Sequence, residues 1–135
     1  MLGAMDAAQA IADLCEISPQ IRDVVVVGAD GAPAGSNLAD DAAAGRLADG
    51  GRRLVEAAEA LRPAVAQLEA ATLGGSVFVV RDGERLIVAT TTPEPTVGLV
   101  FYDLKSCLRS IEEPPPPKPA RRRAPAKKKA EDAAA

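Results

Sequence analysis

Two cysteines, Cys15 and Cys107, are the residues of this chain best suited to nucleophilic, redox or metal chemistry. The sequence contains no histidine, so no Cys–His pair can form, and two thiols alone cannot complete a metal cluster. Phosphate-binding loop spacing and the G-x-S-x-G turn of hydrolases are also missing from the sequence. We therefore predict that the protein is not an enzyme and uses no cofactor. A thiol redox switch is the less favoured alternative, because buried thiols in a reducing compartment are usually inert.

A basic run near the end of the sequence, RRRAPAKKK, is the other chemically distinctive feature. Its charged members are Arg121, Arg122, Arg123, Lys127, Lys128 and Lys129. Such a run can attract an anionic membrane, nucleic acid or an acidic protein surface. No aromatic residue interrupts it, so stacking on single-stranded bases is not supported. We favour a solubilising tail and keep the three anionic partners as alternatives.

Four successive prolines, residues 114–117, separate this run from the rest of the chain. They cannot continue a helix and favour an extended polyproline conformation. With Lys118 and Pro119 they resemble a ligand for a polyproline-binding module, but a plain spacer explains them as well and is favoured. We expect one domain over residues 1–113 and a disordered, Pro-rich basic tail over residues 114–135.

Charge is divided unevenly between these two parts. Residues 1–113 carry 9 basic and 17 acidic residues, and residues 114–135 carry 7 basic and 2 acidic ones. The domain and the tail therefore have opposite net charge and attract opposite kinds of surface. No secretory leader and no apolar run approaching ~20 residues is seen, which predicts a cytoplasmic protein.

The composition also bears on the core. Hydrophobic residues make up 47% of the chain but aromatic residues only 2%, so the core must consist of small aliphatic side chains. A second copy would supply apolar area that so small a domain lacks. We expect a homodimer.

Hydrophobic periodicity and turn residues predict the elements of the domain. Val24 to Val27 form a β-branched run that suits a strand covered on both faces. The alanine-rich third strand could also be helical. The predicted order is a helix over residues 5–17, strands over 23–28 and 33–37, a long helix over 40–61, strands over 65–72, 77–81 and 86–91, and a helix over 97–111.

The long helix carries the candidate interaction sites. Its small and apolar residues suit packing against a second copy, whereas its charged face suits a partner protein. Asp49 and Arg53 are spaced for an i,i+4 ion pair. The predicted dimer interface is Leu47, Gly50, Gly51, Leu54 and Ala58, with Leu68 from the third strand. The predicted partner-binding residues are Arg46, Asp49, Arg53 and Glu56; a solvated face is the alternative.

Three segments resemble the roadblock/dynein light chain family, most of all its bacterial branch. VVVVGADGAP at residues 24–33 is similar to the family's first hairpin, GSVFVV at 75–80 to its fourth strand, and VGLVFYD at 97–103 to the start of its last helix. The resemblance implies an α+β, profilin-like sandwich: a five-stranded antiparallel sheet with the first and last helices on one face and the long helix on the other. It also implies that Cys15 and Cys107 are near neighbours.

The same resemblance implies a homodimer that pairs the third strands edge to edge, packs the long helices together and binds Ras-like small GTPases. In some members binding stimulates GTP hydrolysis. The expected function is therefore regulation or scaffolding of such a GTPase in bacterial signalling. The alternative is a GTPase-independent adaptor tethered by its tail to nucleic acid or membrane. A small-molecule sensor is disfavoured, because a core of small aliphatics places no polar groups for a ligand.

Overall fold

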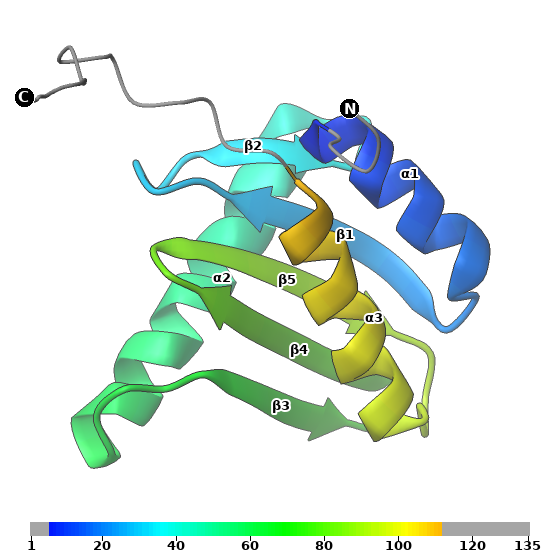
Figure 1. Cartoon of the computed structure of the whole chain (residues 1–135). Helices are drawn as coiled ribbons and strands as arrows, with labels where there is room; N and C mark the ends of the chain where they lie inside the picture. Colours follow the sequence, from blue (N-terminus) through cyan, green and yellow to red (C-terminus); the bar gives the residue numbers. More distant parts are fainter. Residues whose placement is uncertain (1–5, 112–135) are drawn as a thin grey trace, which may run out of the picture.

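Residues 6–111 are described by the computed structural model, and the predicted tail with its basic run lies outside them. Within this range the five strands form one antiparallel sheet in the order β2-β1-β5-β4-β3 (Figure 1). The predicted order of helices and strands is confirmed. The elements are α1 Ala7–Ile17, β1 Ile21–Val27, β2 Pro33–Ser36, α2 Asp41–Leu61, β3 Gln67–Thr72, β4 Gly75–Asp82, β5 Arg85–Thr91 and α3 Val97–Ser110.

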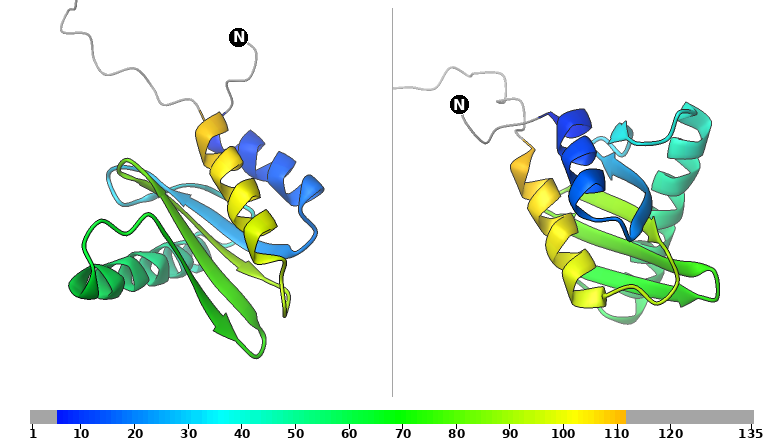
Figure 2. Two further views of the ribbon diagram at one scale, coloured as in Figure 1. Left: turned by 60° about the horizontal axis from the view of Figure 1, so that its bottom comes forward. Right: turned by 90° about the vertical axis from the view of Figure 1, so that its right-hand side faces the viewer.

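Helices cover both faces of the sheet. α1 and α3 lie side by side on one face, and α2 crosses the other face (Figures 1 and 2). α2 packs chiefly against β1, β2, β5 and β4, whereas α3 packs against β4 and β5. The α+β sandwich that the resemblance implied is therefore confirmed, including the placement of each helix.

The valine run of β1 shows why the sheet needs two helical layers. Val24 and Val26 belong to the apolar cluster under α1 and α3, and Val25 and Val27 belong to the cluster under α2. All four are at most 2% exposed. Because successive side chains of a strand point to opposite faces, four consecutive valines can be buried only if both faces are covered.

The aromatic residues concentrate in the layer of α1 and α3. Phe78 of β4 is fully buried, and its ring meets that of Phe101 of α3 edge to face, with ring centroids 4.9 Å apart. Such an arrangement is the favourable geometry for two aromatic quadrupoles. This pair fixes the position of α3 over the sheet.

α2 approaches the sheet through small residues. Its buried face consists of Ala44, Ala48, Gly51 and Val55. A Cβ atom at Gly51 would lie 2.3 Å from Cγ2 of Val88 in β5, so only glycine allows this approach. The prediction for Gly51 therefore needs correction: the residue contacts the sheet of its own chain rather than the surface available to a second copy.

β3 is a strand, which resolves the ambiguity of its alanine-rich sequence. All six of its residues pair with β4. β4 begins at Gly75, two residues earlier than predicted, because Gly75 adopts a φ of 139° and approaches the Thr91 carbonyl where a Cβ would not fit. β1 likewise begins at Ile21, before a bulge between Ile21 and Asp23.

Candidate interaction surfaces

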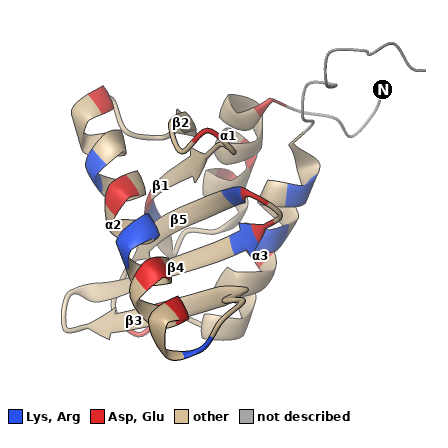
Figure 3. Cartoon of the chain, turned by 90° about the vertical axis from the view of Figure 1, so that its left-hand side faces the viewer, with Lys and Arg blue, Asp and Glu red and all other residues tan. Residues whose placement is uncertain are grey.

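α2 carries charged residues of both signs along its length (Figure 3). Arg46, Arg53 and Glu56 are exposed, and Asp49 is half-buried among them. Asp49 accepts from Arg53, with Nε and Oδ2 3.0 Å apart, which is the predicted i,i+4 pair. The structure thus brings the four predicted partner-binding residues onto one helix face.

Arg52 is a contributor that the sequence analysis missed. One guanidinium nitrogen donates to the Gly31 carbonyl in the β1–β2 turn, and the other lies 3.0 Å from Asp49 Oδ1. Asp49 therefore holds Arg52 toward the sheet and Arg53 toward solvent. The spacing of Asp49 and Arg52 was visible in the sequence, but the turn that Arg52 reaches lies 21 residues away.

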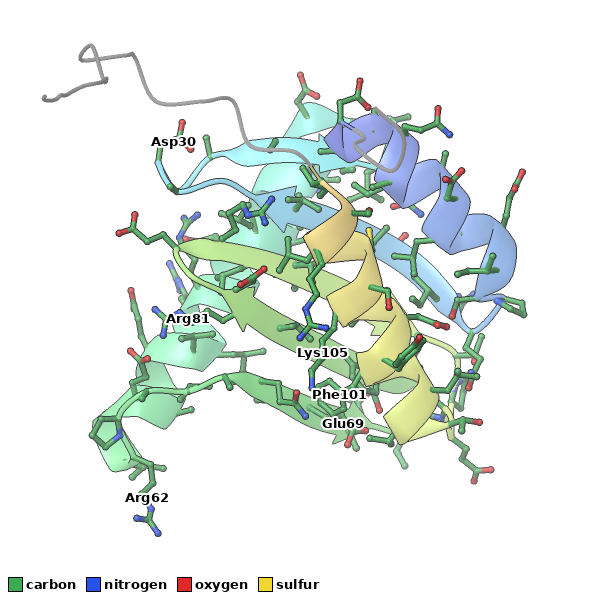
Figure 4. The ribbon with its side chains drawn as sticks, viewed as in Figure 1. Asp30, Arg62, Glu69, Arg81, Phe101 and Lys105 are labelled. Carbon is green, nitrogen blue, oxygen red and sulfur yellow. The ribbon has the colours of Figure 1, made fainter. Side chains whose placement is uncertain are left out.

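A second ionic contact joins α2 to β4. Arg81 points from β4 toward α2 (Figure 4), where its guanidinium donates to Glu59 Oε2. The same carboxylate accepts from the backbone N–H of Val65 at 3.3 Å. Glu59 thereby positions the segment that leads from α2 into β3.

Half-buried apolar residues of α2 and of the segment from Val65 to Val77 pack against the cluster under α2. Leu47, Leu54 and Leu68, three of the predicted interface residues, are half-buried against the cluster under α2. Val65 and Val77 pack against the same cluster. We call these five residues the α2–β3 surface. Of the other predicted interface residues, Ala58 is half-buried on α2, and Gly50 is exposed with no atom near its would-be Cβ.

β3 is an outermost strand of the sheet. Among the described residues only β4 pairs with it, so one row of its backbone N–H and C=O groups has no strand partner. Leu73, in the turn after β3, is completely exposed, and so is most of Leu61 at the end of α2. An edge strand flanked by exposed leucines is a site where another strand can add.

The two cysteines lie in the layer of α1 and α3, as predicted. Cys107 is buried in the core cluster and Cys15 packs against that cluster. Burial, with a smaller contribution from the neighbouring Cys15 and Asp13, raises the pKa of the Cys107 thiol to about 12. Burial also raises the pKa of Cys15, opposed by a hydrogen bond from the Asn37 amide. Neither thiol has the low pKa of a reactive cysteine.

Two further properties concern metal binding and the membrane. Within residues 6–111 no three Cys, Asp or Glu side chains gather closely enough to hold a metal ion. None of the helices in this range combines the length and the apolar character of a membrane span.

Comparison with known proteins gives matches among solved structures. No model of a known protein family matches the sequence, and no curated protein does. A Roadblock/LC7 domain from Streptomyces avermitilis is 17% identical with a TM-score of 0.66, over 78% of this chain and 94% of that chain. Myxococcus xanthus MglB is 14% identical with a TM-score of 0.61, over 77% of this chain and 89% of that chain. The gliding protein MglB from Thermus thermophilus is 15% identical with a TM-score of 0.58, over 77% and 84%.

At such low sequence identity, the likeness to these structures shows the fold alone. It includes the five-stranded sheet, the helix pair on one face and the single long helix on the other. The segments VVVVGADGAP, GSVFVV and VGLVFYD imply the same features through their resemblance to the family. The chain has the roadblock/LC7 fold.

Proposed function

We propose that the protein is a non-enzymatic, dimeric regulator or scaffold of a Ras-like small GTPase. Fold alone does not establish function. The proposal draws on the likeness to the two MglB structures and on the surfaces that residues 6–111 leave open. The observation that carries it is the charged outer face of α2 beside an unpaired sheet edge.

The dimer would form through β3 and the α2–β3 surface. Pairing of two β3 strands would satisfy the free row of backbone groups and extend the sheet into a second copy. The half-buried Leu47, Leu54 and Leu68 would then lose their remaining contact with water. This arrangement also brings the α2 helices of both copies to one side of the assembly.

The GTPase would contact the outer faces of these helices. Arg46 and Glu56 have no ion pair or side-chain hydrogen bond within residues 6–111, so they are free to pair with charges of a partner. Arg53 is different, because Asp49 already holds its guanidinium. An effect on GTP hydrolysis would therefore come from ordering the residues of the GTPase rather than from an arginine donated by Arg53.

Affinity purification from the cell of origin tests this function. The tagged full-length protein is crosslinked and compared with the variants Arg46→Glu and Glu56→Arg. Arg109→Glu, on α3 at the opposite face of the sheet, is the matched control. A small GTPase recovered with wild type and Arg109→Glu, but depleted with both α2 variants, would support the proposal. Recovery of nucleic acid or membrane without any GTPase would contradict it and favour the tethered adaptor.

A further inference from the structure

A groove runs between α1 and α3, on the face of the sheet opposite to α2. The two helices lie side by side, and the start of α1 lies at the same end as the end of α3 (Figures 1 and 2). The hollow between them has a volume of about 130 Å³. We call it the α1–α3 groove; its lining residues are Ala10, Asp13, Leu14, Ile17, Asp103, Ser106, Cys107 and Ser110.

Asp103 is the unusual member of this lining. It is only 7% exposed, yet within residues 6–111 it has no hydrogen bond and no ion pair. Asp13 also lines the groove, from α1, and among the described residues its carboxylate accepts only from the Gln9 side-chain amide, at 3.0 Å. Two carboxylates thus line this groove, and no basic residue of the described chain lines it with them. The groove therefore suits a positively charged occupant.

Exposed apolar side chains continue the groove at its far end. Ile17 is 66% exposed at the end of α1, Leu99 is 49% exposed and Tyr102 is 67% exposed. Leu99 and Tyr102 lie four residues before Asp103 and Ser106, so they extend the same face of α3. An exposed aromatic ring beside carboxylates is the surface that Pro-rich, basic peptides recognise.

The opposite flank of α3 has the reverse charge. Lys105 and Arg109 line a hollow with Arg81 of β4, and Figure 4 shows Lys105 and Phe101 on the side of α3 toward β4 and β3. Asp82 is the only acidic residue in that lining. A basic segment would therefore be repelled from this flank and attracted to the α1–α3 groove.

We propose that the α1–α3 groove binds residues 114–123 of the same chain, PPPPKPARRR. The segment joins four successive prolines, a composition that favours the polyproline conformation recognised by aromatic surfaces, to four cationic residues, Lys118, Arg121, Arg122 and Arg123. Running from Ser110 toward the start of α3, the prolines would reach Tyr102, and Lys118 would pair with Asp103. Asp13, which lies nearer to Ser110, would add to the attraction of the cations. This inference does not rest on the proposed GTPase function.

The point of attachment makes the contact possible within one chain. α3 ends at Ser110, which itself lines the groove, so the segment begins a few residues from its binding site. From Ser110 back to Asp103 the helix rises only about 11 Å. Six residues in the polyproline conformation span about 19 Å. Residues 114–119 are thus long enough to run the length of the groove.

Tyrosine fluorescence tests the proposal directly. The chain has one tyrosine and no tryptophan, so its tyrosine emission reports Tyr102 alone. Collisional quenching by acrylamide is measured on the full-length protein and on a full-length variant with Lys118, Arg121, Arg122 and Arg123 changed to serine. Because a docked polyproline segment shields one of the two ring faces, the variant should have a quenching constant about twofold higher. In 1 M salt, where the screening length is about 3 Å, the wild type should approach the variant.

The variants Asp13→Asn and Asp103→Asn test the same contact by changing the groove instead of the tail. Each should raise the quenching constant toward that of the tail variant, and the matched control Asp30→Asn, in the β1–β2 turn, should not. Amide spectra of wild type and tail variant should differ at Ile17, Leu99 and Ser106 but not along α2. Equal quenching in wild type and tail variant would overturn the proposal. So would quenching that rises on dilution, because the cover would then come from another molecule.

Discussion

Gly51 of α2 lies directly against Val88 of β5. A Cβ atom at Gly51 would stand 2.3 Å from Cγ2 and 2.9 Å from Cγ1 of Val88, closer than side-chain atoms approach one another. β5 is the central strand of the sheet, so this contact closes the apolar cluster under α2 at its middle. Glycine inside a helix costs about 1 kcal/mol relative to alanine. Here the close approach of helix and strand offsets that cost.

Gly51→Ala should therefore destabilise the protein even though it raises helix propensity. Overpacking of a filled core typically costs about 1–3 kcal/mol. Gly45→Ala, in the same helix, is the matched control, because no atom lies within 4 Å of its would-be Cβ. It should stabilise by up to about 1 kcal/mol. Urea denaturation measures both free energies of unfolding, and a stabilising Gly51→Ala would show that α2 does not approach β5 as described.

Arg52 and Arg53 share one carboxylate but should differ in their contribution to stability. Arg52 donates to both Asp49 and the Gly31 carbonyl, whereas Arg53 is 77% exposed and contacts Asp49 alone. Arg52→Met should lower the free energy of unfolding by about 1 kcal/mol, because the turn loses a charge-assisted hydrogen bond. Arg53→Met should change it by less than about 0.5 kcal/mol. Equal losses in chemical denaturation would contradict this assignment.

The proposed dimer can be tested through the direction of the β3 backbone. The Arg81 N–H donates to the Ala66 carbonyl, and in an antiparallel ladder alternate residues point to the same neighbour. The backbone N–H and C=O groups of Leu68 and Ala70 therefore also point toward β4, whereas those of Glu69 and Ala71 point to the free edge of the sheet. Ala71→Pro removes a donor only from that edge, which a folded sheet tolerates. We expect a monomer with native circular dichroism in sedimentation velocity.

Ala70→Pro is the control for this experiment, since it removes a donor that bonds to β4. It should lower the melting temperature, which Ala71→Pro should leave close to that of the wild type. If Ala71→Pro sediments as the wild type does, pairing through β3 is wrong.

Local sequence patterns predicted helices and strands well where the residues of a segment allow only one arrangement. Four consecutive valines required a strand covered on both faces, and the Asp82-Gly83 turn placed a hairpin between β4 and β5. Contacts between distant segments could not be predicted in the same way. Gly50 and Gly51 both fit the apolar stripe of α2, and only the position of Val88 decides which one is buried.

The same limit applies to the candidate sites. The four charged residues of α2 share a face because helical periodicity alone puts them there. Asp103 is buried because α1 packs beside α3, and nothing in the sequence around residue 103 indicates the position of α1. Arg52 contributes through a turn that is distant in the sequence. Residues that share one face of a helix could be predicted from helical periodicity. Contacts between separate elements could not, because they depend on how those elements pack.

Cys107 should make stability depend on pH in the alkaline range. Its pKa is about 12 in the folded protein, against an ordinary value of 9.0 for an exposed thiol. Between these values the unfolded chain has released the thiol proton and the folded protein has kept it. The unfolded state then binds fewer protons, so the free energy of unfolding falls as the pH rises from about 9 toward 12. Below pH 9 both states hold the proton and the contribution is constant.

Urea denaturation of wild type and Cys107→Ala at pH 8, 9 and 10 measures this effect. The variant loses packing at every pH, so its free energy of unfolding is lower throughout, but it should fall less steeply above pH 9. Cys15→Ala should change the slope less, because Cys15 is only half-buried and its hydrogen bond from Asn37 opposes the rise in its pKa. Parallel slopes in wild type and Cys107→Ala would show that the thiol has the same pKa in the folded protein as in the unfolded chain. Such a thiol would react with a disulfide reagent as an exposed cysteine does, and the redox alternative would then regain support.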